Sequence, residues 1–261
     1  MRTMATKILF QKKMLIFWWF LGIFTITTFT MYFFPVFKNG TLSSSIASLP
    51  LSLQKLLGDK ASWTTVGGYI SQQIFALRAP LEISVLSIFI FNSLTTGDER
   101  KGLLETQLSL TNGRTRILIN KLIAGIFIVG IVTSAVLAGV ILGDILIHYH
   151  YSYIKTLIIT TNCLLLVLDF GLVAFLVGCM TGRNGVAVGI ASIYAFGSYL
   201  VSSMAGTVSS LKFIDNFSLF HYYQNLATFD LGNLIVMCGF GLFCIVMGML
   251  FFSLRDIRTS S

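Results

Sequence analysis

Six separate apolar stretches, each about 20 residues long or more, dominate this chain and restrict what it can fold into. Backbone N–H and C=O groups cannot stay unpaired in hydrocarbon, so a segment that crosses a bilayer is either an α-helix or a strand of a closed barrel. The apolar runs here are long and continuous, which favours helices. We therefore predict an all-α integral membrane protein with six transmembrane helices, at 14–34, 74–94, 122–146, 157–180, 185–204 and 231–254.

The composition agrees with this fold class. Of the 261 residues, 55% are hydrophobic and 11% are charged, and the mean hydropathy is +0.84. An ordinary soluble domain has about 25% charged residues. All four cysteines, Cys163, Cys179, Cys238 and Cys244, fall inside predicted helices. There we expect them to pack as small apolar side chains, not to form disulfides or a metal site.

The first apolar run resembles a secretory signal at its start, because Arg2, Lys7, Lys12 and Lys13 precede it. The apolar core of a signal peptide has about 7–15 residues, and this run is longer. Pro35 also stands where small cleavage-site residues would be expected. We therefore expect this segment to be retained as the first transmembrane helix.

The distribution of basic residues predicts the orientation of the chain. The segments 1–13, 95–121, 181–184 and 255–261 carry 12 Lys and Arg residues, whereas the alternate connections carry five. The positive-inside rule places the more basic connections in the cytoplasm. We therefore predict a multi-pass protein of the cell membrane with both termini in the cytoplasm. The net charge of +8 requires no nucleic-acid partner, because basic residues beside a membrane meet anionic lipid head groups.

The connection between the second and third predicted helices is densely charged and begins with a helix-start pattern. Thr96 and Glu99 form a capping box, and Asp98 adds negative charge to the first turn. We predict a short amphipathic helix over 96–113, ended by the turn dipeptide Asn112-Gly113. Such a helix can lie on the lipid surface or can transmit force from a soluble partner. If the helix binds a soluble partner, the residues expected to contact that partner are Thr96, Asp98, Glu99, Gly102, Leu103, Leu104, Glu105, Leu108, Arg114 and Arg116. Arg114 and Arg116, together with Lys121, are also expected to anchor the chain at the inner leaflet.

Two connections on the predicted outer side carry helical or aromatic patterns. Leucines spaced along 49–58 fit one helical face, which predicts a short amphipathic helix that lies at the outer interface or packs on the bundle. The connection 205–230 interleaves aromatic and polar residues, which is typical either of an ordinary interfacial aromatic belt or of a helical hairpin that covers this side of the bundle.

A few charged residues lie inside predicted helices, where each costs about 2.5–3.5 kcal/mol on insertion scales. Arg78 and Glu82 are four residues apart and can pair along one helix face, either as a gate or as a structural pair. Asp169 lies in mid-helix with no local partner; it can face a polar cavity, a proton path or another subunit, or can be hydrogen-bonded in the core. Asp144 lies near an outer helix end, where we expect it to be wetted.

Other candidate motifs are weaker. Gly139-x-x-x-Gly143 and Gly185-x-x-x-Gly189 permit close approach of helices, within the chain or across a dimer. His148 and His150 lie in an outer connection without nearby carboxylates or thiols, so we expect surface histidines and no metal site.

The chain resembles the permease subunits of type-2 ABC transporters, in particular the half-size permeases of antibiotic and multidrug exporters. The resemblance covers most of the chain in order. Its main motif is the charged connection, with Leu103 in place of the usual threonine and Asp98 in place of the usual glutamate. Further agreement lies in Leu49-Pro50, Gly68-Tyr69-Ile70, Ser218-Leu219-Phe220-His221-Tyr222-Tyr223 and Phe252-Ser253-Leu254-Arg255-Asp256-Ile257.

The resemblance implies a six-helix subunit of an exporter that pairs with a second permease subunit, identical or different, and with separate nucleotide-binding ATPase subunits. Residues 1–13 would form a cytosolic amphipathic helix, and 96–113 would be the coupling helix that contacts the ATPase. The chain itself has no G-x-x-x-x-G-K-[ST] phosphate loop. We therefore expect it to be no enzyme and to bind no cofactor, with ATP and Mg²⁺ held by the partner subunit. An ion-coupled secondary transporter that uses Asp169, and a membrane assembly subunit that transports nothing, are the alternatives.

Overall fold

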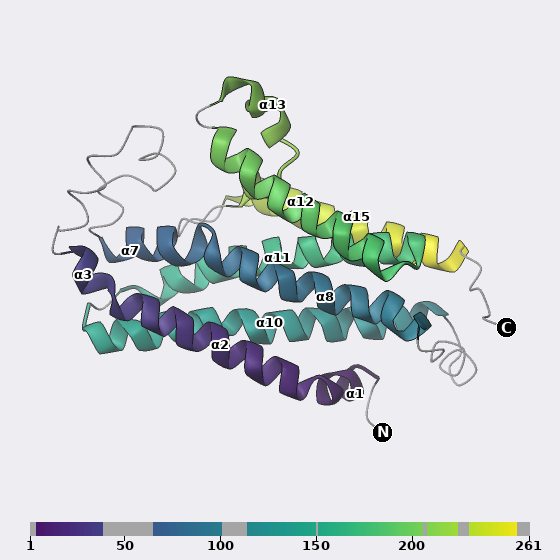
Figure 1. The fold of residues 1–261 in the computed structure, drawn as a ribbon, viewed down its shortest axis with the longest axis horizontal. Coiled ribbons are helices and arrows are strands. Elements are labelled where there is room, and N and C mark those ends of the chain that lie inside the picture. Colours follow the sequence, from purple (N-terminus) through teal and green to yellow (C-terminus); the bar gives the residue numbers. More distant parts are fainter. Residues whose placement is uncertain are drawn as a thin grey trace.

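The computed structural model describes residues 4–38, 65–100, 114–149, 151–205, 208–223 and 230–254. In these ranges six helices are long and apolar enough to cross a membrane (Figure 1). The prediction of an all-α chain with six such helices is therefore confirmed by helix length and composition. The candidate spans are Lys13–Val36, Val66–Gly97, Arg116–Ile147, Tyr153–Thr181, Asn184–Ala205 and Leu231–Leu254.

Each long span is one helix or a short series of helices. Small helices precede or follow the long ones at the chain connections. The elements are α1 (Met4–Gln11), α2 (Lys13–Tyr32), α3 (Phe34–Lys38), α7 (Val66–Tyr69), the π-helix η1 (Ile70–Phe75), α8 (Arg78–Arg100), α10 (Arg114–Ile147), α11 (Tyr153–Thr181), α12 (Asn184–Ala205), the 3₁₀ helix η2 (Ser209–Leu211), α13 (Lys212–Asp215), α14 (Leu219–Tyr222) and α15 (Leu231–Leu254).

The predicted helix bounds differ most at the start of the second span, which begins at Val66 instead of 74, and around the charged connection. α15 has the predicted bounds, whereas α8 continues past residue 94 to Arg100 and α10 begins at Arg114 instead of 122. Hydropathy locates the part of a helix that suits hydrocarbon, and a helix can extend beyond it into polar sequence. The predicted outer helix at 49–58 lies outside the described residues.

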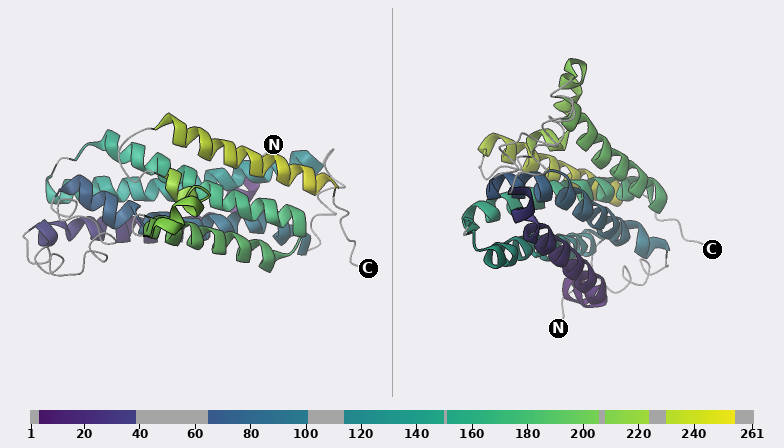
Figure 2. Two further views of the ribbon diagram at one scale, coloured as in Figure 1. Left: turned by 90° about the horizontal axis from the view of Figure 1, so that it is seen from above. Right: turned by 60° about the vertical axis from the view of Figure 1, so that its left-hand side comes forward.

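The buried core of the bundle lies along α11. This helix packs against α8, α10, α12 and α15, while α2 packs on α10. In the most apolar part of α11, 67% of the residues are buried, against 22% for both α12 and α15. These two helices therefore lie on the outside of the bundle, next to α11 (Figure 2).

Local sequence explains two of the helix ends. α11 ends at Gly182, whose φ of 64° is left-handed and whose N–H donates to Gly178 O at 2.9 Å. Glycine adopts this conformation without the steric penalty of a Cβ. Upstream of α8, the turn at 76–77 places Pro80 in the first helical turn, where its missing N–H costs no hydrogen bond.

The elements of the charged connections gather at one end of the bundle. α1, the C-terminal end of α8, the N-terminal end of α10 and the C-terminal end of α15 lie together there (Figure 1). α3, α7 and the α10–α11 connection lie at the opposite end. We call the first the basic end of the bundle, because its described segments carry Lys7, Lys12, Lys13, Arg114, Arg116 and Lys121.

Candidate functional site

The predicted coupling segment is described only at its two margins. Gly102, Leu103, Leu104, Glu105 and Leu108 lie outside the described residues, so their role remains a prediction. Asp98 and Glu99 belong to the last turn of α8, and Arg114 and Arg116 belong to the first turn of α10, where Arg116 is exposed.

The predicted helix start at Thr96 is wrong. α8 runs through this residue, and the Thr96 hydroxyl donates to Asn92 O at 3.0 Å. A threonine inside a helix bonds back to the carbonyl four residues earlier, and this competes with the capping role that the same sequence pattern predicts. The charged residues that follow Thr96 therefore extend a transmembrane helix.

A buried polar network connects this part of α8 to α12. Asn92 and Thr96 are 3% and 2% exposed. The Asn92 amide donates to Asn184 Oδ1 at the start of α12, and the Thr96 hydroxyl lies 3.0 Å from Asn92 Oδ1. Hydrogen bonds between membrane helices link the helices that carry them. A movement of the C-terminal end of α8 is thus linked to the first turn of α12.

A second contact at the basic end connects α8 to the N-terminal helices. Lys12, between α1 and α2, donates from Nζ to Ser93 Oγ at 2.9 Å. Ser93 Oγ in turn donates to Ile90 O at 2.8 Å. The expected N-terminal helix is present as α1, and it packs on α10.

Lys121 corrects another expectation at this end. We expected it to anchor the chain at the inner leaflet, but its side chain is only 2% exposed. It lies on the face of α10 that also carries the buried Ile117, Leu118 and Ala124, so it points into the bundle. A side chain three or four residues from buried neighbours on a helix shares their environment, which counting basic residues cannot reveal.

The predicted pairing of Arg78 and Glu82 is confirmed. Arg78 Nε lies 3.2 Å from Glu82 Oε1, and the side chains are 27% and 37% exposed. Arg78 Nη1 also donates to Thr30 Oγ1 on α2. The pair therefore connects α8 to α2 at the end of the bundle opposite the basic end, where the structure supports a stabilising role.

Asp144 is not wetted, contrary to expectation. It is 2% exposed, and the Tyr151 N–H lies 3.1 Å and 3.0 Å from its two carboxylate oxygens. His148, with a φ of 56°, makes the turn between these residues. Asp144 thus closes the α10–α11 connection.

His148 is exposed, and no group of three or more metal-ligating side chains occurs among the described residues, which do not include His150.

The two glycine pairs differ. A Cβ on Gly139 would lie 2.8 Å from Thr27 Cβ, and one on Gly143 would lie 2.3 Å from Met31 Cβ. This pair therefore forms the close contact between α10 and α2 within the chain. A Cβ on Gly185 or Gly189 would meet no atom of another described helix within 4 Å.

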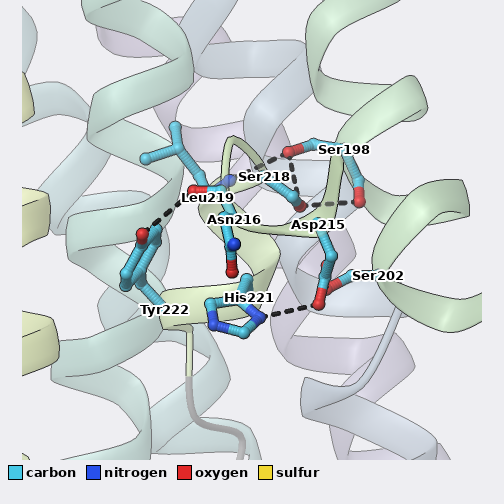
Figure 3. A network of polar contacts seen from close by, with 8 residues as sticks. All are labelled: Ser198, Ser202, Asp215, Asn216, Ser218, Leu219, His221 and Tyr222. Atoms are coloured by element: carbon cyan, nitrogen blue, oxygen red, sulfur yellow. Dashed lines mark hydrogen bonds and ion pairs between the residues drawn. The ribbon is translucent and has the colours of Figure 1, made fainter. Parts of the chain in front are cut away.

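A network that the sequence analysis missed holds the segment 208–223 against α12 (Figure 3). The hydroxyls of Ser198 and Ser218 lie 2.8 Å apart, and Leu219 N donates to Ser198 Oγ at 3.0 Å. These groups are buried, so the segment is fixed to the side of α12 by satisfied polar contacts.

Asp215 connects two further residues of this network, Ser202 of α12 and His221. Asp215 accepts a hydrogen bond from Ser202 Oγ at 2.7 Å and lies 2.7 Å from His221 Nδ1 (Figure 3). A hydrolytic triad places its serine on the histidine, with the aspartate on the opposite nitrogen. Here the serine bonds to the aspartate, so the geometry is that of a structural connection. The one-turn spacing of Ser198 and Ser202 is the only local signal for it.

The aromatic residues of this segment divide into two groups. Phe213 and Phe217 are 74% and 69% exposed, as an interfacial aromatic belt requires, whereas Phe220 and Tyr223 are buried. Burial keeps the pKa of Tyr223 well above its usual value, and its hydroxyl donates to Phe75 O at 2.9 Å. This bond satisfies a carbonyl at the end of η1, next to the interruption before α8.

Asp169 lies on α11 and is 4% exposed. Its Oδ2 has no hydrogen-bond partner in the part of the chain that the structure describes. The possibilities of a polar cavity, a proton path, another subunit or a hydrogen-bonded core aspartate therefore stay predictions, with one oxygen unpaired among the described residues.

Comparison of the chain with protein-family models, with curated proteins and with solved structures gives no match.

Proposed function

We propose that this chain is the membrane-spanning subunit of an ATP-driven exporter, in which a separate ATPase subunit moves the helices. The observation that carries the proposal is the basic end of the bundle. The ends of α8 and α10 that flank the charged segment lie there with α1, and hydrogen bonds lead from α8 to α12 and to Lys12. The proposal places this end on the cytoplasmic side of the cell membrane, in line with the positive-inside rule.

The mechanism follows from rigid-body motion. ATP binding would close two nucleotide-binding subunits, each in contact with the segment 96–113 of one permease subunit. Because this segment continues from α8 and leads into α10, its displacement would tilt both helices. The Asn92–Asn184 contact would pass the motion to α12, so that two permease subunits alternate between inward-open and outward-open states.

Co-purification tests this proposal. The tagged chain, extracted from its host membrane in mild detergent, should elute with a soluble protein that carries a phosphate loop and hydrolyses ATP. Leu104→Asp and Glu105→Arg should each remove that protein from the eluate. Lys212→Glu, an exposed charge change in α13 near the opposite end, is the control and should retain it. Retention of the ATPase by both coupling-segment variants would refute the assignment of this segment.

An ion-coupled carrier is the second candidate, and Asp169 is the observation that favours it. A buried intramembrane carboxyl without a partner for one oxygen is typical of proton or ion pathways. A carrier should transport with an ion gradient and no ATP, whereas the proposed exporter should stop when ATP is removed. Transport under neither condition would favour a non-transporting assembly subunit.

A further inference from the structure

Asp169 is enclosed at the junction of three helices. It is the seventeenth residue of the 29 in α11, near the middle of that span. A Cβ on Gly241 of α15 would lie 2.7 Å from Asp169 Oδ1, so the absence of a side chain at this position makes room for the carboxyl group. The rings of Tyr194 on α12 and Phe240 on α15 stack, with centroids 6.3 Å apart. Asp169 therefore lies where both outer helices meet α11.

The polar groups near Asp169 are few. The Tyr194 hydroxyl donates to Phe217 O at 3.0 Å. Tyr194 and Cys244 are the titratable groups of α12 and α15 that interact electrostatically with the carboxyl group. Tyrosine and cysteine side chains are uncharged at neutral pH in the absence of a strong perturbation. Neither residue supplies a positive charge.

The helices around Asp169 also lack a cation that can neutralise it. The sequences of α12 and α15 contain no Lys, Arg or His, and no Asp or Glu. The charged side chains of the described parts of α8 and α10 stand toward the ends of those helices, and Arg78 is already paired with Glu82. On α11 itself, the only other charged residue is Lys155, near the N-terminal end of the helix.

We infer that Asp169 is a proton-binding site that holds a neutral carboxylic acid when α12 and α15 are packed on α11. An ionised carboxylate without a partner in an apolar interior is far less stable than its protonated form. The neutral acid also turns the oxygen that lacks a donor into a hydroxyl, for which the penalty of an unmade hydrogen bond is much smaller.

This site links pH to the packing of the outer helices. If α12 and α15 separate, water reaches the carboxyl group and the proton can leave. Packing of the helices back onto α11 then requires that a proton binds again. The packed state is therefore favoured at low pH. The population of the separated state increases as the pH rises through the value at which Asp169 ionises.

Infrared spectroscopy of the chain in lipid nanodiscs tests the inference. The difference spectrum of the wild type minus Asp169→Asn at pH 7 should contain the C=O stretching band of a neutral carboxylic acid, and the band should vanish at high pH. Asp144→Asn is the matched control, because Asp144 is equally buried but its carboxylate accepts the Tyr151 N–H. The Asp169 band cancels in the difference spectrum of this control, so it should be absent there. Carboxylate bands for Asp169 at pH 7 would overturn the inference.

A second measurement uses the wild-type chain alone, in case the Asp169→Asn chain does not fold. A hydrophobic carbodiimide reacts only with protonated carboxyls, whose O–H adds across its C=N bond without loss of a leaving group. Mass spectrometry of peptides should find the adduct on Asp169 at pH 7, with a yield that falls at high pH. An absent adduct, or a yield that does not depend on pH, would overturn the inference. Neither readout involves transport or ATP, so failure here leaves the proposed function untouched.

Discussion

The α2–α10 contact and the outer face of α12 carry the same glycine spacing but have opposite environments. Gly139 and Gly143 are pressed against α2, whereas Gly185 and Gly189 have open space where a Cβ would be. α10 is half buried in its most apolar part, with 50% of those residues buried against 22% for α12. Small-residue spacing thus permits close packing without showing that it occurs.

The same comparison separates the two sides of the bundle. On one side, α2, α8, α10 and α11 are joined by close backbone contact and buried apolar side chains. On the other, α12 and α15 pack mainly on α11, and only 22% of the residues in the most apolar part of each are buried. We call the first side the fixed side, because the backbone contact at Gly139 and Gly143 holds even its most exposed span, α2, against α10.

The largest change in stability is expected for a substitution in the Gly139/Gly143 pair, and the Gly185/Gly189 pair supplies the comparison. Gly143→Ile should destabilise the chain by about 3 kcal/mol, because even its Cβ would overlap Met31. Gly189→Ile, the matched change on α12, should alter stability by no more than about 0.5 kcal/mol. Thermal unfolding in detergent measures both. Equal losses for the two variants would contradict the distinction.

The next largest loss of stability is expected in the α10–α11 connection, on the fixed side of the bundle. Asp144→Ala leaves the partly buried Tyr151 N–H without its acceptor and should cost about 1–3 kcal/mol. Asp144→Asn keeps a carbonyl oxygen at this position and should cost less. The same unfolding assay compares them, and an alanine variant as stable as the asparagine variant would argue against the hydrogen bond.

The link between the two sides is expected to be weaker. In a double-mutant cycle, Asn92→Ala and Asn184→Ala should show a coupling energy of about 0.6 kcal/mol, and at most about 1.7, as interhelical hydrogen bonds do in membranes. A coupling energy indistinguishable from zero would mean that α12 is held to α8 by apolar packing alone.

The smallest effect is expected for the partly exposed ion pair of Arg78 and Glu82. Glu82→Gln should cost about 0.2–1 kcal/mol, and the loss should shrink as salt is added, because water and ions screen the pair. A loss that is large and independent of salt would show that the pair is more buried in the membrane than its exposed fractions indicate.

Much of the fold follows from the sequence because its signals are local. Six helices follow from hydropathy, and the Arg78–Glu82 pair follows from i, i+4 geometry. The buried positions of Lys121 and Asp144 do not, since in a uniformly apolar helix no periodicity marks the inner face. The Thr96 pattern is ambiguous even locally, because threonine can cap a helix or bond back within one.

The candidate sites were predictable only in part for a related reason. Asp169 is conspicuous in the sequence as a charge in an apolar helix, yet its unpartnered oxygen depends on what α12 and α15 place beside it. The contact of Asp215 with Ser202 and His221 joins a helix to a later loop. No sequence spacing predicts which residues such a fold brings together.

The most direct test of the proposed ATP-driven movement is a cross-linking rate between the two sides. Asn92→Cys and Asn184→Cys form a suitable pair, because the two native asparagine side chains touch. The four native cysteines would first be replaced, so that no other disulfide can form. In membranes that contain the co-purifying ATPase, ATP should change the rate of disulfide formation at this pair, and Leu104→Asp should abolish the change. A rate that ATP leaves unaltered while the ATPase stays bound would contradict the proposal.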